Sequence, residues 1–310
     1  MGTAIRIRNL IKRYGDTTAV DGISLDVEEG TLFAFLGPNG AGKSTTINCT
    51  CTLLTVDEGT IEVDGHLVGR DDAAVRRSIG VVFQDSVLDP ILTVRENLEI
   101  RGALYGIRGR RFASRLSDVA ATTGIEEILD KRYGRLSGGQ RRRADIARGL
   151  VHTPRVLFLD EPTTGLDPQT RARVWESVRS LQKNSGTTVF LTTHYMEEAN
   201  RADFVSIIDH GRIVASDTPA RLRLQHSHDV LRLMPRDATG LRASLDAAGT
   251  AFREKNDVFS VLVGSSLAAL PVLRDNERFL SGFEMVQGSM DDVFMAITGR
   301  DIREDKEEES

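Results

Sequence analysis

The chain has 310 residues, of which 40% are hydrophobic, so it is long enough for one large and one small domain, each with its own core. Its formal net charge of −5 argues against a general nucleic-acid binder, whose phosphate contacts need an excess of Lys and Arg. Cys49 and Cys51 are too few and too close for a disulfide framework, and no stretch approaches the roughly 20 apolar residues that span a bilayer.

The N-terminal segment alternates apolar and polar residues in the manner of β-strands. Turn residues at Gly15-Asp16 and Asp21-Gly22 separate these runs, which predicts a small antiparallel layer. Strands of a second type follow, short and almost entirely apolar, as expected for strands that are buried on both faces. They are predicted at 31–36, 79–83, 156–159, 188–192 and 204–208.

A helical insert interrupts the buried strands. Between Thr93 and Leu136 the apolar residues recur at helical spacing, as Val94 and Leu98 illustrate. We therefore predict an α/β domain over residues 1–225, with a helical subdomain at about 86–137.

A second, smaller domain is predicted after Gln225, where the helical pattern that precedes it stops. Residues 226–300 read as β, α, β, β, α, β, the order of a ferredoxin-like α+β unit. Ser289 is placed to cap a last helix. Residues 301–310 are mostly charged and predict a disordered tail, because they offer almost no apolar surface to offset the entropy of ordering.

The first chemical motif follows the buried strand at 31–36. Its sequence, GPNGAGKST, fits the phosphate-loop pattern GxxxxGK[ST] and opens a predicted helix. In such a loop the backbone N–H groups converge on phosphate oxygens, Lys43 reaches the outer phosphates and the Ser44 hydroxyl ligates magnesium. The predicted nucleotide-binding residues are Gly37, Pro38, Asn39, Gly40, Ala41, Gly42, Lys43, Ser44 and Thr45.

A pair of carboxylates ends the buried strand at 156–159. Asp160 is predicted to serve the magnesium ion, and Glu161 to orient or deprotonate an attacking water. By themselves these two residues also fit the solvated acidic end of a strand.

A five-residue motif shortly before that strand selects among the triphosphatases. Leu136-Ser137-Gly138-Gly139-Gln140 resembles the signature of ABC ATPases. The segments RLSGGQRRRADIARGL, VLFLDEPTTGLDP and LTTH follow the order and spacing of that family, and the resemblance covers about residues 4–225. It implies a P-loop ABC cassette in which two cassettes face head to tail, each ATP lying between one phosphate loop and the other signature.

Four further positions match this family one at a time. Tyr14 lies where an aromatic residue stacks on adenine, although packing alone is the alternative. Gln84 matches the Q-loop, which touches magnesium or water and senses the membrane partner. Asp167 matches the D-loop, which crosses to the other subunit, and His194 matches the switch histidine at the γ-phosphate.

Within the family, the cassette is most similar to the daunorubicin-resistance type of exporter ATPase. The resemblance is carried by Gly37 to Thr46, by Asp160 to Pro168 and by the ending Met290 to Arg300, while Gln140 stands where many relatives carry Met. It implies export of drugs, lipids or other amphipathic molecules, with ATP and Mg²⁺ as cofactors. It also implies a separate transmembrane permease, a second cassette that we expect to be an identical chain, and attachment through the permease to the cytoplasmic side of the cell membrane.

Two other functions stay open at this stage. One is an importer ATPase whose C-terminal domain is regulatory, and the other is a soluble ABC ATPase that acts on ribosomes or DNA. The single compact cassette favours the transporter over the second. The basic run Arg141-Arg142-Arg143 is interpreted as a solvated helix face rather than a nucleic-acid patch, and no nucleic-acid partner is expected.

The loop from Asp85 to Thr93 is the predicted docking site for the permease, because it joins the nucleotide sensor Gln84 to the helical insert. Val87, Leu88, Ile91 and Leu92 make it more apolar than a free loop needs. Packing of these residues beneath the loop is the alternative.

Overall fold

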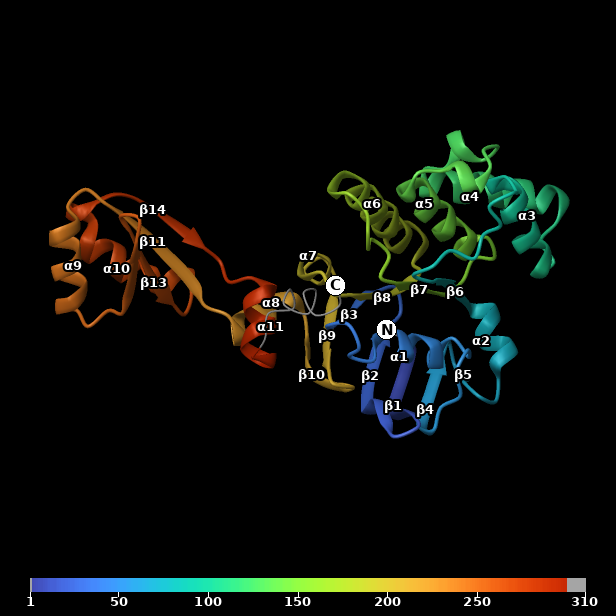
Figure 1. Ribbon diagram of the computed structural model, residues 1–310, viewed down its shortest axis with the longest axis horizontal. Coiled ribbons are helices and arrows are strands. Elements are labelled where there is room, and N and C mark those ends of the chain that lie inside the picture. Colours follow the sequence, from blue (N-terminus) through green and yellow to red (C-terminus); the bar gives the residue numbers. More distant parts are fainter. Residues whose placement is uncertain (1, 300–310) are drawn as a thin grey trace. The chain divides into compact units, whose positions relative to one another are not determined.

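A computed structural model of the chain describes residues 2–299. It has two compact units, Met1–Ser216 and Asp217–Ser310 (Figure 1). The α/β class of the first is as predicted. The predicted domain border after Gln225 differs from this division, and the predicted tail at 301–310 lies outside the described residues.

The first unit opens with the antiparallel layer that the alternation predicts. Ile5, Ile7 and Leu10 on its first strand are fully buried, as alternation requires. The strands lie in the order β2-β1-β4-β5. Their bounds are β1 (Thr3–Tyr14), β2 (Thr17–Glu28), β4 (Glu58–Val63) and β5 (His66–Leu67).

The central sheet has the order β10-β9-β3-β8-β7-β6. Its strands are β3 (Leu32–Leu36), β6 (Ile79–Val82), β7 (Val156–Asp160), β8 (Thr188–Thr193), β9 (Phe204–Asp209) and β10 (Arg212–Asp217). Strands β9, β3, β8, β7 and β6 pair in parallel, and every residue of β3, β7 and β8 is buried. Parallel strands end at one edge of the sheet, so the loops after β3, β6, β7 and β8 are brought together there.

Helices cover both faces of the central sheet (Figure 1). Helix α1 (Lys43–Thr50) packs between it and the antiparallel layer, where Ile47 and the buried Cys49 and Cys51 join the core around Phe33, Phe35 and Phe158. The remaining helices are α2 (Asp72–Ser78), α3 (Val94–Leu104), α4 (Gly109–Thr123), α5 (Gly138–Leu150), α6 (Pro168–Ser185) and α7 (Met196–Ala199). Helices α3 and α4 lie within the predicted insert.

The second unit follows the predicted order of strands and helices. Its antiparallel sheet has the order β12-β13-β11-β14, and Leu231, Leu233 and Phe259 are fully buried beneath its helices. The elements are α8 (Pro219–His226), β11 (Asp229–Pro235), α9 (Ala238–Ala247), β12 (Phe252–Lys255), β13 (Val258–Val263), α10 (Ala269–Asn276), β14 (Leu280–Val286) and α11 (Met290–Thr298). Pro271 falls in the first turn of α10, where proline is tolerated.

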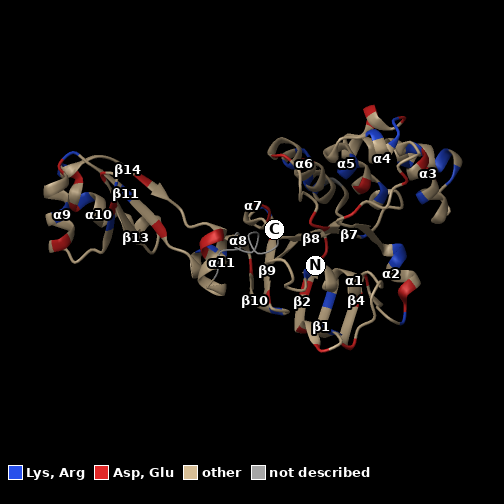
Figure 2. Cartoon of the chain, viewed as in Figure 1, with Lys and Arg blue, Asp and Glu red and all other residues tan. Residues whose placement is uncertain are grey.

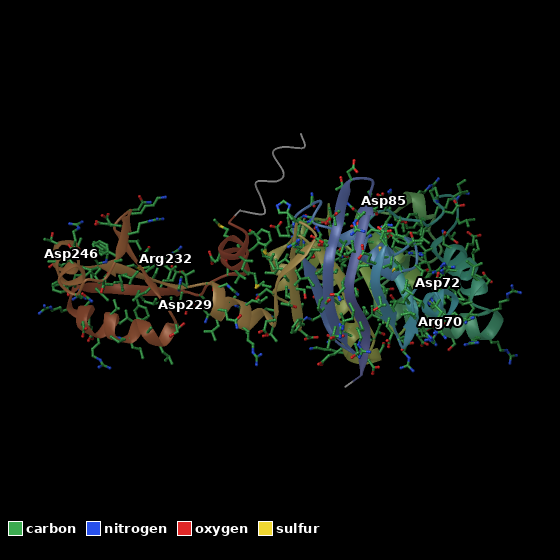
Figure 3. All side chains as sticks on the ribbon, turned by 90° about the horizontal axis from the view of Figure 1, so that it is seen from below. Arg70, Asp72, Asp85, Asp229, Arg232 and Asp246 are labelled. Atoms are coloured by element: carbon green, nitrogen blue, oxygen red, sulfur yellow. The ribbon has the colours of Figure 1, made fainter. Side chains whose placement is uncertain are left out.

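Helix α8 packs against the last helix, α11, within the second unit. Ser289 caps α11 in a reciprocal arrangement with Asp292, and Phe294 and Leu222 are both buried. At the start of β11, the carboxylate of Asp229 (Figure 3) accepts hydrogen bonds from Ser266 Oγ at 2.7 Å and from the Gly288 N–H at 3.1 Å. The border therefore precedes α8, because this helix finds its apolar partner more than sixty residues further along the chain.

Candidate nucleotide-binding site

The predicted phosphate loop connects β3 to α1 and leaves the start of that helix uncapped. Gly42 has φ +103°, and a Cβ atom there would lie 2.4 Å from the carbonyl oxygen of Ala19 on β2. Only glycine fits this conformation and this approach. The first N–H groups of any helix lack acceptors within the helix, and no side chain caps those of α1. This helix end is therefore suited to an anion.

The side chain of Lys43 folds back over this loop. It is 4% exposed, and its Nζ donates to the carbonyl oxygens of Gly37 at 2.8 Å and Pro38 at 2.9 Å. The same Nζ lies 3.4 Å from Oε1 of Glu161. Burial lowers the pKa of Lys43, and the carboxylate of Glu161 opposes that shift. Among the ion pairs of the described residues, this buried cation contacts one carboxylate, that of Glu161.

Asp160 is held beside the first turn of α1. Its Oδ1 accepts hydrogen bonds from Ser44 Oγ at 3.1 Å and from Thr192 Oγ1 at 2.5 Å. Thr192 lies opposite Asp160 in the register of β7 and β8. A hydroxyl and a carboxylate oxygen in contact are ligands that Mg²⁺ prefers, so Ser44 and Asp160 fit this ion.

Glu161 leaves the strand with an unusual backbone, at φ +45°. Its Oε1 lies 3.3 Å from Nδ1 of His194, although this contact lacks good hydrogen-bond alignment, and its Oε2 accepts from Thr164 Oγ1 at 3.1 Å. Burial acts to raise the pKa of Glu161, but His194 and Lys43 outweigh it and hold the pKa at about 2. The carboxylate is therefore ionised at neutral pH and able to accept a hydrogen bond from water.

The structure thus brings Lys43, Ser44, Asp160, Glu161 and His194 into one connected cluster at the edge of the sheet. Gln84 follows β6 at this same edge and is exposed. Tyr14 ends β1 and is 49% exposed, and the next strand of its hairpin carries Ala19, which touches the phosphate loop.

The predicted signature starts α5. Ser137 caps this helix together with Gln140, since the Ser137 N–H donates to Gln140 Oε1 at 3.1 Å and the Gln140 N–H donates to Ser137 Oγ at 3.4 Å. Leu136 is buried, whereas Ser137 and Gly138 are exposed. The first turn of α5 is therefore both ordered and open to an approaching molecule.

The predicted D-loop lies beside the signature in the same chain. Asp167 caps α6 by accepting from the Thr170 N–H at 3.0 Å, and contacts with Thr170 lower the pKa of Asp167. A Cβ atom on Gly139 would lie 2.1 Å from Cγ2 of Thr170. Glycine at 139 thus allows α5 and α6 to approach closely.

Two charged residues that support the site were not identified from the sequence. The solvated face predicted for the basic run is wrong for Arg142, which is 7% exposed and donates to the backbone carbonyls of Asp160, Glu161 and Pro162. Glu198 is 1% exposed and accepts from Thr193 Oγ1 at 2.6 Å, Trp175 Nε1 at 3.2 Å and Thr163 Oγ1. It ties the loop after Glu161 to the strand that precedes His194.

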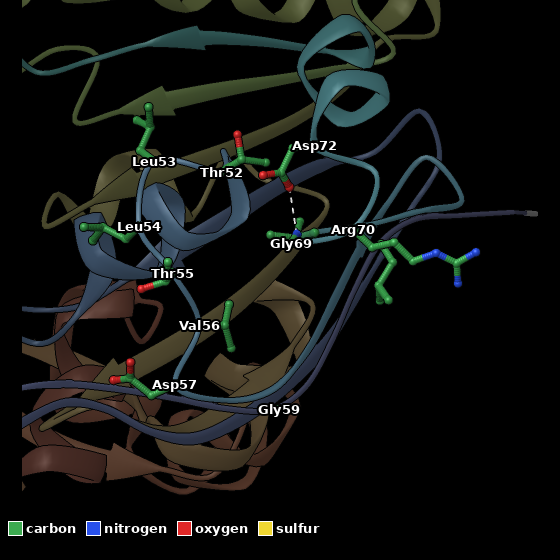
Figure 4. A pocket seen from close by; sticks show the side chains of 12 residues that line it. Thr52, Leu53, Leu54, Thr55, Val56, Asp57, Gly59, Gly69, Arg70 and Asp72 are labelled. Atoms are coloured by element: carbon green, nitrogen blue, oxygen red, sulfur yellow. Dashed lines mark hydrogen bonds between the residues drawn. The ribbon is translucent and has the colours of Figure 1, made fainter.

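A separate pocket of about 530 Å³ opens near the end of α1 (Figure 4). It is lined by the segment from Thr52 to Asp57, by Gly59, by the segment from Leu67 to Arg70 and by Asp72, whose Oδ1 accepts from the Gly69 N–H at 2.7 Å. None of the predicted site residues is among those that line it. This pocket is therefore distinct from the cluster at the sheet edge.

The family model described as ABC transporter matches residues 20–164 of this chain. The daunorubicin resistance ATP-binding protein DrrA3 of Streptomyces coeruleorubidus is 42% identical, with 97% of this chain and 98% of that protein covered. The daunorubicin/doxorubicin resistance ATP-binding protein DrrA of Streptomyces peucetius is 40% identical, over 99% and 96% of the two chains. A Nod factor export ATP-binding protein I, from Ralstonia nicotianae, is 38% identical over 97% and 95%.

Two solved structures of similar proteins cover about seven-tenths of the chain. The cbiO1 protein of Clostridium perfringens, part of an ABC transporter complex, is 31% identical with a TM-score of 0.67, covering 72% of this chain and 91% of that one. A dimeric bacterial ABC transporter cassette is 30% identical with a TM-score of 0.62, covering 69% and 98%. The predicted ABC cassette fold of the α/β class is confirmed by the likeness to these structures.

Proposed function

The chain belongs to the ABC transporter ATP-binding proteins, a family that hydrolyses ATP, and from this premise we propose that it powers an exporter of drugs, lipids or other amphipathic molecules. The cluster of Lys43, Ser44, Asp160, Glu161 and His194 is the observation that carries the proposal. The names of the relatives mention drug resistance and Nod factor export, and they support the outward direction of transport.

Each member of the cluster has a place in ATP hydrolysis. The open N-terminus of α1 and Lys43 bind the phosphates, and Tyr14 stacks on adenine. Ser44, Asp160 and Gln84 hold Mg²⁺, which neutralises phosphate charge. The ionised Glu161 accepts a hydrogen bond from the attacking water, and His194 lies beside it to contact the γ-phosphate.

A second copy of the chain completes each site in this proposal. The first turn of α5 presents the exposed Ser137 and Gly138, whose helix end suits phosphate, to the ATP of the opposite cassette. Asp167 lies close by, because it caps α6 through the Thr170 N–H and the side chain of Thr170 packs against Gly139. The dimeric form of a similar cassette supports this arrangement.

Transport also requires a membrane partner, because none of the helices within residues 2–299 is long and apolar enough to cross a bilayer. The loop after Gln84 is the proposed docking site for the permease, and the proposed location of the chain is the cytoplasmic side of the membrane. Val87 and Ile91 are 58% and 71% exposed, whereas Leu88 is buried. The prediction that Leu88 contacts the permease is therefore wrong, and Val87 and Ile91 remain the proposed contacts. Basic and acidic residues are interspersed on the neighbouring α3 (Figure 2), and Ile100 and Leu104 are exposed among them.

Replacing Val87 and Ile91 together by Asp is expected to abolish coupling to the permease. Charges on this loop would disfavour an apolar contact, while the cluster around Lys43 stays intact. We expect recruitment to vesicles that contain the permease to fail, together with ATP-driven uptake of an amphipathic dye into vesicles whose cassettes face outward. The ATPase activity of the purified chain should persist.

The matched control is Val214→Asp, an exposed apolar residue on β10, which should leave recruitment and dye uptake unchanged. Unchanged membrane association in the Val87 and Ile91 variant would rule out this loop as the docking site. Dye movement only in the opposite direction would contradict export.

The second unit is proposed to be an accessory to nucleotide binding, since every site residue lies in the first. A chain that ends after Ser216 should bind ATP as the full chain does. In a chain that ends after Gln225, α8 loses its partner α11 and should unfold, because a helix this short is marginal alone. Trypsin should then cut quickly at Arg221 and Arg223. Protection of these two sites would show that α8 packs on the first unit, as the border predicted at Gln225 requires.

A further inference from the structure

Arg142, the middle residue of the basic run in α5, is buried at the ends of two neighbouring strands. Helix α5 lies over β6 and β7 (Figure 1), and the guanidinium of Arg142 donates through Nε and both Nη atoms to backbone carbonyls. The accepting oxygens belong to Phe83 (2.5 Å), Gln84 (3.4 Å), Asp160 (2.8 Å), Glu161 (3.1 Å) and Pro162 (2.7 Å). A single side chain therefore contacts both the segment with Gln84 and the segment with Glu161.

This contact begins where the pairing of the two strands ends. The last register pair of β6 and β7 is Val82 with Leu159. Beyond it the two backbones no longer pair with one another, and buried carbonyls without donors are unfavourable. The planar fork of N–H groups on Arg142 donates to these carbonyls instead. It reaches the segments after both strands, which a single ammonium group does not do.

The backbone of Glu161 depends on such support. A non-glycine residue at φ +45° is strained, and such a conformation persists only where its surroundings hold it. The Glu161 N–H donates to Thr192 Oγ1 at 3.0 Å, and its carbonyl accepts from Arg142. Arg142 thus helps to set the direction in which the carboxylate of Glu161 points.

The same helix carries the signature in its first turn, just before Arg142. Arg142 lies five residues after Ser137, about 7.5 Å along the helix axis. One turn further on, the buried Asp145 accepts from Ser86 Oγ at 2.6 Å and from the Tyr133 hydroxyl at 3.2 Å. A shift of α5 would therefore move the segment around Gln84 and the carbonyl of Glu161 together.

We propose that Arg142 is a positioning residue that ties the signature of one cassette to Glu161 of the same cassette. Engagement of the opposite ATP by Ser137 to Gly139 then sets the geometry of the chain's own hydrolytic site, and so couples the two sites of the dimer. This proposal rests on the proposed head-to-tail function. It predicts that the loss of Arg142 slows hydrolysis in cis, at the Glu161 of the same chain, and not in trans.

Mixed dimers with two different tags separate these possibilities. In the cis arm, an Arg142→Gln chain is paired with a Glu161→Gln chain, so the intact Glu161 belongs to the chain with altered Arg142. In the trans arm, one chain carries both substitutions and its partner is unaltered. Single-turnover hydrolysis of ATP is compared with a reference dimer of an unaltered chain and a Glu161→Gln chain.

We expect hydrolysis to fall roughly 10- to 10²-fold in the cis arm, the effect of a misplaced reactive group. The trans arm should stay within about twofold of the reference, and ATP affinity should be unchanged in both arms. Equal rates in the two arms, or equal slowing in both, would overturn the proposed role of Arg142. Arg143→Gln in the cis arm is the control, because Arg143 contacts the Gly124 carbonyl in the helical insert instead, and it should match the reference.

Arg142→Lys is tested in the same two arms and keeps the experiment decisive where Arg142→Gln does not fold. It preserves the charge, but one nitrogen cannot span both strand ends, so the same asymmetry between cis and trans is expected. Failure of the reference pair to form an ATP-bound dimer would refute the head-to-tail function and the proposal with it. A reference dimer that forms and hydrolyses, without any asymmetry in the two arms, would refute the role of Arg142 alone.

Discussion

ATP hydrolysis is expected to be lost when Lys43 is replaced by alanine. Its Nζ is the buried cation of the phosphate loop, in contact with the carbonyls of Gly37 and Pro38 and with Glu161. The phosphate loop then loses this cation, and the Glu161 carboxylate loses a neighbour that lowers its pKa. Removal of a single preorganised donor costs roughly 10² to 10³ in rate, and here ATP binding weakens as well.

The measurement is ATPase activity together with the binding of a fluorescent ATP analogue to the purified chain. Lys183→Ala serves as a matched control, because Lys183 is an exposed lysine near the end of α6. It should behave as the unaltered chain does. Normal turnover by the Lys43 variant would refute the assignment of the nucleotide site.

Glu161→Gln is expected to slow hydrolysis by roughly 10² to 10⁴ while ATP binding survives. Glutamine keeps the size of the side chain and the backbone conformation, but it lacks the negative charge that accepts a proton or orients water. Because hydrolysis no longer separates the two cassettes, the variant should accumulate as an ATP-bound dimer. ATP should also raise its thermal midpoint, since a ligand that binds only the folded state stabilises it.

Size-exclusion chromatography with ATP and Mg²⁺ tests this expectation, with an ATPase assay on the same sample. Glu176→Gln, at an exposed position on α6, is the matched control and should remain active. A Glu161 variant that stays monomeric with ATP and Mg²⁺ would contradict the sandwich mechanism for the isolated chain. Retained hydrolysis would show that Glu161 does not act on the water.

Features that depend on nearby residues were predictable from the sequence. The apolar runs of β3, β7 and β8 are buried throughout, as their composition predicts, and Ser289 caps α11 through a residue three positions away. The phosphate loop is also local, because one strand, one turn and one helix build it. The roles of the phosphate loop and of the other site residues stay predictions. That these residues lie close together follows from parallel strands that end at one edge of the sheet.

Only the tertiary structure decided which charged and apolar side chains are buried by distant partners. Arg142 looks like its neighbours Arg141 and Arg143 in the sequence, yet it meets carbonyls of Phe83 and Glu161 that lie 59 and 19 residues away. Glu198 is buried by donors from three other elements, and α8 leaves the first unit because α11 supplies its apolar partner. Helical periodicity says which residues share a face, but which face is covered depends on how distant elements pack against it.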